Sequence, residues 1–164
     1  MGYLKDQAGI VERYLVEAEN WDEHLRNSKH QIIQFVKEIQ PDELFVLGSG
    51  WLLDFPLDDI YRMCRRILLL DIHHPPQIKK LAEKYPGVEC IYADLTGGLI
   101  EEAYKYGELP LSDSSKNHII PVKKGRGVVS LNILNQLDII LIDAMKKKRN
   151  IPDEVVIQYR KSIQ

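Results

Sequence analysis

The sequence is poor in cysteine and lacks any long apolar run. Only two cysteines, Cys64 and Cys90, occur among 164 residues, with no CxxC motif, which argues against a disulfide framework and a structural zinc site. Cys90 stands in an apolar run and is expected to be a buried, unreactive thiol. No apolar stretch approaches membrane-spanning length, and the first residues lack the apolar centre of a signal peptide. These absences predict a soluble, cytoplasmic protein.

A strong excess of one charge sign is also missing. The formal net charge is −2, so no basic field favours nucleic acid or anionic lipid. The short basic runs at 123–124 and 146–149 are typical of loops and helix ends, and we do not expect them to bind nucleic acid. With 45% hydrophobic and 28% charged residues in 164, the composition predicts one globular domain spanning residues 1–164.

The first forty residues are predicted to form helices. Apolar residues recur at helical spacing from Ile10 to Ala18. Asn20, with Glu23 three residues later, resembles a capping box and predicts the start of a second helix. Pro41 is expected to end that helix, because the residue before a proline is disfavoured in the helical region.

Four short apolar runs follow, and helical patterns separate them. Runs without polar alternation are typical of strands buried on both faces of a parallel sheet. The fold class predicted for residues 41–164 is therefore α/β, a Rossmann-like doubly wound, mostly parallel sheet, with residues 1–40 as an N-terminal helical extension. The expected strands are Leu44–Leu47, Ile67–Leu70, Val88–Ala93 and Val128–Leu131, and the expected helices between them are Leu57–Cys64, Pro76–Tyr85 and Leu99–Tyr106.

The last third of the chain is less regular. Residues 107–127 are rich in glycine, proline and serine and predict a long polar loop. Residues 137–143 fit a strand with an acid at its end, but the apolar residues from Leu134 to Met145 share one helical face, and we prefer the helix. A final helix is expected to begin near Pro152.

Polar and glycine residues follow the predicted strands, at the edge where open α/β sheets bind ligands. Gly48-Ser49-Gly50 ends the first strand, and Asp71 follows the second, 23 residues after Gly48. A carboxylate about 20 residues beyond the first glycine is placed to accept ribose hydroxyls. Asp94 follows the third strand and could accept an exocyclic adenine amine. Each feature also fits an ordinary turn or a helix cap.

The residues after the glycines distinguish between cofactors. A dinucleotide places its pyrophosphate on a helix N-terminus, where a third glycine permits close packing. Leu53 occupies that position here, and Asp54, Asp58 and Asp59 follow. Their negative charge would repel a pyrophosphate and tolerate a phosphate-free cation such as S-adenosylmethionine (SAM).

The motifs LFVLGSG, LLLDIHH, CIYADLTG and VVSLN, between Pro41 and Leu137, resemble the successive cofactor motifs of class I SAM-dependent methyltransferases. The resemblance implies SAM as cofactor and methyl transfer to an acceptor that the sequence does not identify. In that family the glycine turn lines the methionine moiety, the first acid binds ribose, the second approaches adenine, and the fourth motif lies beside the reacting methyl group. The cofactor-binding residues implied by position are Gly48, Ser49, Gly50, Asp71, Ile72, His73, Asp94, Leu95, Ser130 and Asn132.

The sequence departs from the family in several places. Val46 stands where the family often has an acid, and Ser130-Leu131-Asn132 is not the Asn/Asp-Pro-Pro-aromatic motif used on amino groups, so no catalytic residue is assigned. The family sheet has seven strands, whereas four are recognisable. The chain is then a piece of a longer protein, a reduced relative, or a domain that a second chain completes, as in a homo-oligomer.

Other interpretations remain open. Asp71-Ile72-His73-His74 invites a metal site, but adjacent histidines point apart on an extended chain, and we expect no metal. His24 and His118 lie in segments that could cover the cleft. A non-catalytic nucleoside-binding or scaffolding domain is the main functional alternative. An NAD(P)-dependent oxidoreductase is disfavoured by Leu53 and Asp54.

Overall fold

The computed structural model describes residues 3–96, 105, 123–131, 139, 142–143, 145–147 and 151–163. The chain divides into two compact units. The first comprises Met1–Ala93 and Lys123–Leu131, and the second comprises Asp94–Val122 and Asn132–Gln164.

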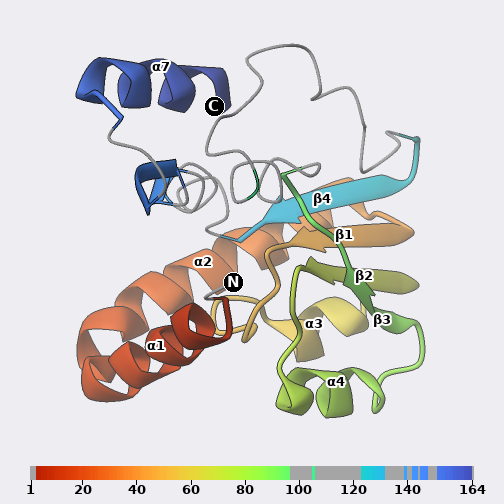
Figure 1. Ribbon diagram of the computed structural model, residues 1–164. Helices are drawn as coiled ribbons and strands as arrows, with labels where there is room; N and C mark the ends of the chain where they lie inside the picture. Colours follow the sequence, from red (N-terminus) through yellow and green to blue (C-terminus); the bar gives the residue numbers. More distant parts are fainter. Residues whose placement is uncertain are drawn as a thin grey trace. The chain divides into compact units, whose positions relative to one another are not determined.

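A parallel sheet forms the centre of the first unit. Its four described strands, β1 (Glu43–Leu47), β2 (Arg66–Asp71), β3 (Val88–Tyr92) and β4 (Arg126–Ser130), lie in the order β3-β2-β1-β4. All three strand pairs are parallel, with Leu47 in register with both Leu70 and Ser130. The predicted α/β, Rossmann-like arrangement is confirmed, and Figure 1 shows the strands side by side.

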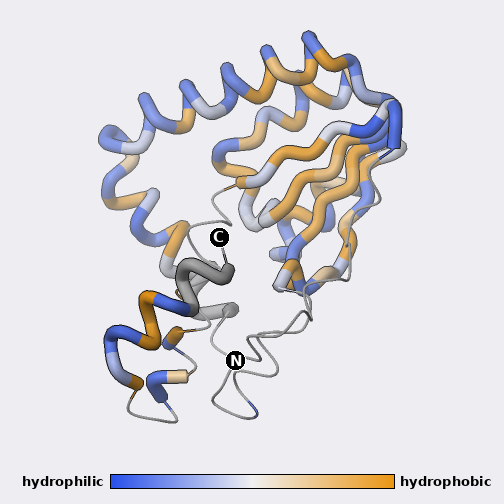
Figure 2. Tube along the Cα trace, turned by 90° about the horizontal axis from the view of Figure 1, so that it is seen from above, coloured by the Kyte–Doolittle hydropathy of each residue, from blue (hydrophilic) through white to orange (hydrophobic). Residues whose placement is uncertain are grey.

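Three helices cover one face of this sheet (Figure 1). They are α2 (Ala18–Ile39), α3 (Leu57–Tyr61) and α4 (Pro76–Ala82). Alternate strand residues, among them Leu44, Val46 and Leu69, pack against these helices and are fully buried. Figure 2 shows the hydrophobic residues concentrated along the strands. Burial of this apolar face supplies the main favourable free energy of folding.

The two central strands are buried on both faces, as their apolar runs predicted. Phe45 and Leu68 point to the face opposite the helices and are also buried. The same prediction was wrong for β3 and β4, where Tyr92 and Val128 are exposed. The reason is position, because β3 and β4 are the outer strands of the described sheet.

The polar loop predicted for residues 107–127 ends earlier than expected, because β4 begins at Arg126. Residues 107–122 of this loop lie outside the described part of the chain.

The N-terminal residues form the expected helical extension. α1 (Tyr3–Val16) precedes α2, and the rings of Tyr14 and Trp21 meet edge to face with centroids 6.4 Å apart. The predicted capping box was wrong, because α2 already begins at Ala18, with no side-chain cap at Glu17. The end of α2 is confirmed, since Gln40, next to Pro41, adopts a left-handed conformation.

Alternating charges bind the four strands together on the face opposite the helices. Glu43 of β1 accepts hydrogen bonds from Arg66 of β2 at 3.3 Å and from Arg126 of β4 at 2.7 Å. Arg66 also pairs in bidentate fashion with Glu89 of β3, at 2.8 and 3.0 Å. The hydrogen bond from Arg126, followed by the other contacts to the two arginines, lowers the pKa of Glu43 from its ordinary value of 4.5, although partial desolvation opposes this.

Most of the described residues of the second unit are helical, and Asp94–Thr96 form a turn. Ile139, Ile142, Asp143 and Met145–Lys147 are all in helical conformation, which confirms the helical interpretation at these positions. α7 (Asp153–Ile163) confirms the predicted final helix after Pro152. Of the predicted helix at 99–106 only Lys105 is described, and it is helical. None of the helices among the described residues combines the length and apolarity needed to cross a membrane.

Replacing Glu43 tests how much its ion pairs with Arg66 and Arg126 contribute to stability. Because the folded state lowers the pKa of Glu43, its stabilising effect is present above pH 4.5 and is lost as the pH falls through the lowered folded pKa. Glu43→Gln should therefore lower the free energy of unfolding near pH 7 and have little effect near pH 3, in urea titrations at both pH values. Glu83→Gln, at an exposed position after α4, is the control. An equal effect of Glu43→Gln at both pH values would contradict the charge interpretation.

Candidate functional site

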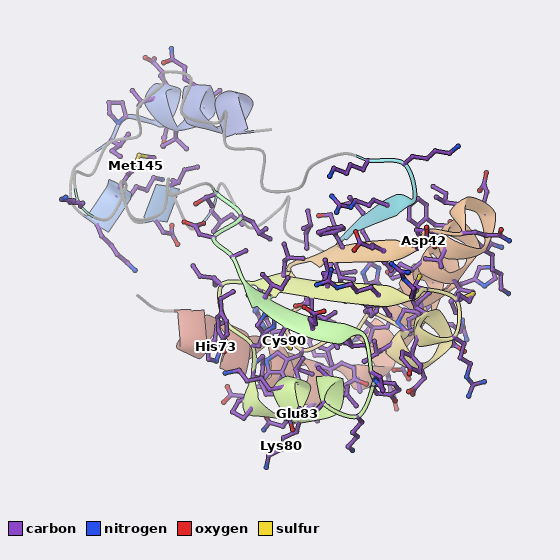
Figure 3. All side chains as sticks on the ribbon, turned by 90° about the vertical axis from the view of Figure 1, so that its right-hand side faces the viewer. Asp42, His73, Lys80, Glu83, Cys90 and Met145 are labelled. Atoms are coloured by element: carbon purple, nitrogen blue, oxygen red, sulfur yellow. The ribbon has the colours of Figure 1, made fainter. Side chains whose placement is uncertain are left out.

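The candidate site lies at the carboxyl edge of the sheet in the first unit. Along the chain, β1, β2 and β3 are added in one direction, whereas β4 pairs with the other side of β1. The strand order therefore reverses between β1 and β4, and open α/β sheets bind ligands at such a switch point. Asp42, before β1, and His73, after β2, mark opposite ends of the strands in Figure 3.

The predicted glycine turn follows β1 at this switch point. Gly48 and Gly50 have φ values of 70° and 42°, in the left-handed region that favours glycine. Leu52 shares this conformation, with a φ of 54°, at an energetic cost for a residue with a Cβ. The Gly48 N–H donates to Leu70 O at 2.9 Å, and the Leu52 N–H donates to Ser49 O at 2.8 Å. These bonds hold a tight backbone loop against the end of β2.

Asp71 joins the end of β2 to this turn. Its Oδ2 accepts the Gly50 N–H at 2.8 Å, and its Oδ1 accepts the His73 N–H at 3.2 Å. The carboxylate is mostly buried, at 9% exposure, so its charge depends on such contacts. The sequence predicted Asp71 beside the glycines, and the structure brings them into direct contact.

Ser49 points into the protein. Its side chain is 2% exposed, and its Oγ lies 3.5 Å from His74 Nδ1. His74 is fully buried, and its Nε2 lies 3.0 Å from Ile91 O in β3. Sequence reasoning considered His74 only as a metal ligand and missed this contact. The one available signal was its place next to the half-exposed His73, since adjacent side chains on an extended chain face opposite sides.

The first unit also contains the predicted cofactor-binding residues Ile72, His73 and Ser130. Ile72 and His73 are partly exposed immediately after Asp71. Ser130 is exposed and in register with Leu47, the residue before the turn. Asn132 lies outside the described residues.

Asp94 and Leu95 belong to the second unit. Asp94 Oδ1 accepts hydrogen bonds from the N–H and the hydroxyl of Thr96, at 2.9 and 2.5 Å. This is the local turn that the sequence allowed as an alternative to adenine recognition. The described contacts therefore give Asp94 a role in its own loop.

No helix begins directly after the glycines. All residues between Gly48 and Pro56 are described, and α3 starts only at Leu57, with no side-chain cap. A pyrophosphate site of the dinucleotide type needs the N–H groups of a helix that starts at the turn. The turn therefore lacks the standard phosphate-binding element.

Acidic residues follow the glycine turn where a phosphate-binding loop would have a helix N-terminus. Burial raises the pKa of Asp54, although its own backbone hydrogen bond and the positive charges of His24 and Lys29 oppose this. Asp58 accepts a hydrogen bond from the Tyr85 hydroxyl. His24, which the sequence placed in a segment that could cover the cleft, is exposed on α2.

Neither cysteine forms a disulfide in the described part of the chain. Both cysteines are free, and burial raises the pKa of the Cys64 and Cys90 thiols, which reduces the reactive thiolate fraction. Across the described ranges, no three histidine, cysteine, aspartate or glutamate side chains gather as a metal site would require.

Comparison with known proteins found no matching family model, no matching curated protein and no matching solved structure.

Replacing Gly50 tests the strain in the turn. A Cβ at Gly50 would meet Gly48 O at 3.8 Å and Asp71 Oδ2 at 3.9 Å, which are ordinary contacts, so only the positive φ opposes it. Gly50→Ala should lower the free energy of unfolding by about 1–2 kcal/mol. Gly9→Ala, in α1 with nothing within 4 Å of its Cβ, should raise it by about 0.5–1 kcal/mol. Denaturant titration measures both, and a stability-neutral Gly50→Ala would contradict the strained turn.

Proposed function

We propose that this protein binds SAM at the carboxyl edge of its sheet and transfers the methyl group to an acceptor. The observation that carries the proposal is the contact of the Asp71 carboxylate with the Gly50 N–H, at 2.8 Å. This contact puts an anionic acceptor and a backbone turn with two glycines together at the switch point of a parallel sheet.

The first step of the argument concerns the adenosine. Ribose offers two neighbouring hydroxyl donors, and a carboxylate is the acceptor best suited to both. Asp71 ends β2, the strand next to the glycine turn. A ribose held there would place its 5′ substituent toward the turn, where Gly48 and Gly50 leave the backbone open to close approach.

The second step concerns charge. The turn lacks a helix N-terminus within reach, and Asp54, Asp58 and Asp59 follow it. These features are unfavourable for the phosphates of NAD(P) and compatible with a sulfonium, because a cation is attracted by nearby carboxylates. The same adenosine site therefore fits SAM better than a dinucleotide.

The third step concerns the reaction. SAM, when bound, supplies an electrophilic methyl group on a positively charged sulfur. The chain's part is to bind and orient, with Asp71 and the glycine turn holding the cofactor so that the methyl group faces an incoming nucleophile. Orientation and exclusion of water can supply much of the rate enhancement of such an in-line displacement. No catalytic side chain is assigned.

Ligand-induced stabilisation tests the cofactor assignment. SAM or S-adenosylhomocysteine at 100 times its Kd should raise the free energy of unfolding by about 2.7 kcal/mol, measured as an increase in Tm, whereas NAD and NADP should have little effect. A shift with NAD and none with either adenosyl ligand would contradict the proposal. A shift with the adenosyl ligands but no methyl transfer to any acceptor offered would favour a nucleoside-binding domain.

Asp71→Asn tests the role of the carboxylate in ligand binding. Asparagine keeps one oxygen for the Gly50 N–H, loses the acceptor for the His73 N–H and removes the negative charge, and hydrogen bonds to charged groups are worth about 1.5–3 kcal/mol. Affinity for S-adenosylhomocysteine should therefore fall about 10- to 100-fold in calorimetric titration, with the fold retained by circular dichroism. Unchanged affinity would remove Asp71 from the site.

A further inference from the structure

A buried histidine connects three separate segments beside the glycine turn. His74 is fully buried and lies between two oxygen atoms. Ser49 Oγ is 3.5 Å from its Nδ1, and Ile91 O is 3.0 Å from its Nε2. Ser49 belongs to the turn after β1, His74 to the segment after β2, and Ile91 to β3. The ring therefore links the carboxyl ends of the three strands, through the Ser49 side chain and the Ile91 main-chain carbonyl.

The partners of His74 determine its tautomer. A backbone carbonyl can only accept, so Nε2 must carry the hydrogen that it donates to Ile91 O. In the neutral ring Nδ1 is then an acceptor, and the Ser49 hydroxyl must be the donor. The hydroxyl of Ser49 is thus directed at His74 and away from any ligand on the outer side of the turn.

Aromatic contacts hold the ring in this orientation. His74 meets Tyr92 of β3 edge to face, with centroids 5.3 Å apart and planes at 78°. The ammonium group of Lys79 lies 5.1 Å from the centroid of the same Tyr92 ring. The Tyr92 ring therefore contacts both the Lys79 ammonium group and the edge or face of the His74 imidazole.

We propose that His74 is a positioning residue for the glycine turn, which it holds in the ligand-binding conformation through the Ser49 hydroxyl. Two side chains from residues 71–74, at the end of β2, contact the glycine turn. Asp71 holds the backbone of Gly50 at 2.8 Å, and His74 holds the side chain of Ser49. Loss of the second contact leaves the turn, with its strained backbone at Leu52, supported by Asp71 and by main-chain bonds alone.

Nuclear magnetic resonance tests this role without any ligand. In the wild-type protein, Nε2 of His74 should resonate as a protonated nitrogen and Nδ1 as an unprotonated acceptor. Ser49→Ala should shift the Nδ1 resonance and accelerate hydrogen exchange of the Gly50 amide by roughly 2- to 10-fold, the range expected for one neutral hydrogen bond. A protonated Nδ1, or unchanged Nδ1 and Gly50 signals in Ser49→Ala, would overturn the proposal.

Ligand affinity provides a second test, which rests on the proposed function. His74→Gln can keep an N–H near Ile91 O but does not place its amide oxygen at the position of Nδ1, whereas His74→Asn can place its oxygen there for the Ser49 hydroxyl. S-adenosylhomocysteine should bind roughly 2- to 10-fold more weakly to His74→Gln and to Ser49→Ala. The double variant should show no further loss, because both changes remove the same contact, and His74→Asn should recover part of the affinity.

Val36→Ala is the control for a general loss of stability. Val36 is fully buried in α2 near its C-terminal end, which leads into the amino end of β1 and thus away from the turn. This variant should lower Tm and leave affinity unchanged. Equal weakening by Val36→Ala, or additive effects of Ser49→Ala and His74→Gln, would overturn the positioning role. If the wild-type protein binds no adenosyl ligand, the proposed function fails, and the resonance measurements alone decide the role of His74.

Discussion

The hydrogen bond from the Gly50 N–H to Asp71 is the contact on which the candidate site depends. It ties the turn after β1 to the end of β2, at 2.8 Å, and it brings a buried carboxylate to the point where the strand order reverses. A carboxylate buried in this way is costly unless it accepts hydrogen bonds. The Gly50 N–H therefore gives a hydrogen-bond partner to a buried oxygen of Asp71, while Asp71 supports a backbone conformation that Gly50 and Leu52 adopt at positive φ.

The sheet makes this contact possible. Parallel pairing puts the carboxyl ends of β1, β2 and β4 at one edge, with Leu47, Leu70 and Ser130 in register. Apolar burial against α2, α3 and α4 holds one face. On the other face, Glu43 pairs with Arg66 and Arg126, and these ion pairs near the amino ends oppose register slippage, because a shifted strand would separate the partners. The ion pairs and the candidate site thus lie at opposite ends of the strands.

Much of this arrangement could be predicted from the sequence, where the signals are local. Continuous apolar runs identified the four strands, and Pro76 and Pro152 marked helix starts. Burial of β3 and β4 was overestimated, because a strand's position in a sheet depends on pairing that a single segment does not encode. His74 was missed for a similar reason, since its partners come from two other segments, Ser49 from the turn after β1 and Ile91 from β3. The capping box at Asn20 failed because α2 continues upstream to Ala18.

Chemical-shift mapping with S-adenosylhomocysteine tests the link between the turn, Asp71 and the cofactor most directly. On titration to saturation, the largest changes among backbone amides should fall on residues 48–50 and 71–73, and those of Gly50 and His73 should respond most because Asp71 accepts both N–H groups. Changes confined to other parts of the chain, or none at saturating ligand, would contradict a cofactor site at the carboxyl edge of the sheet.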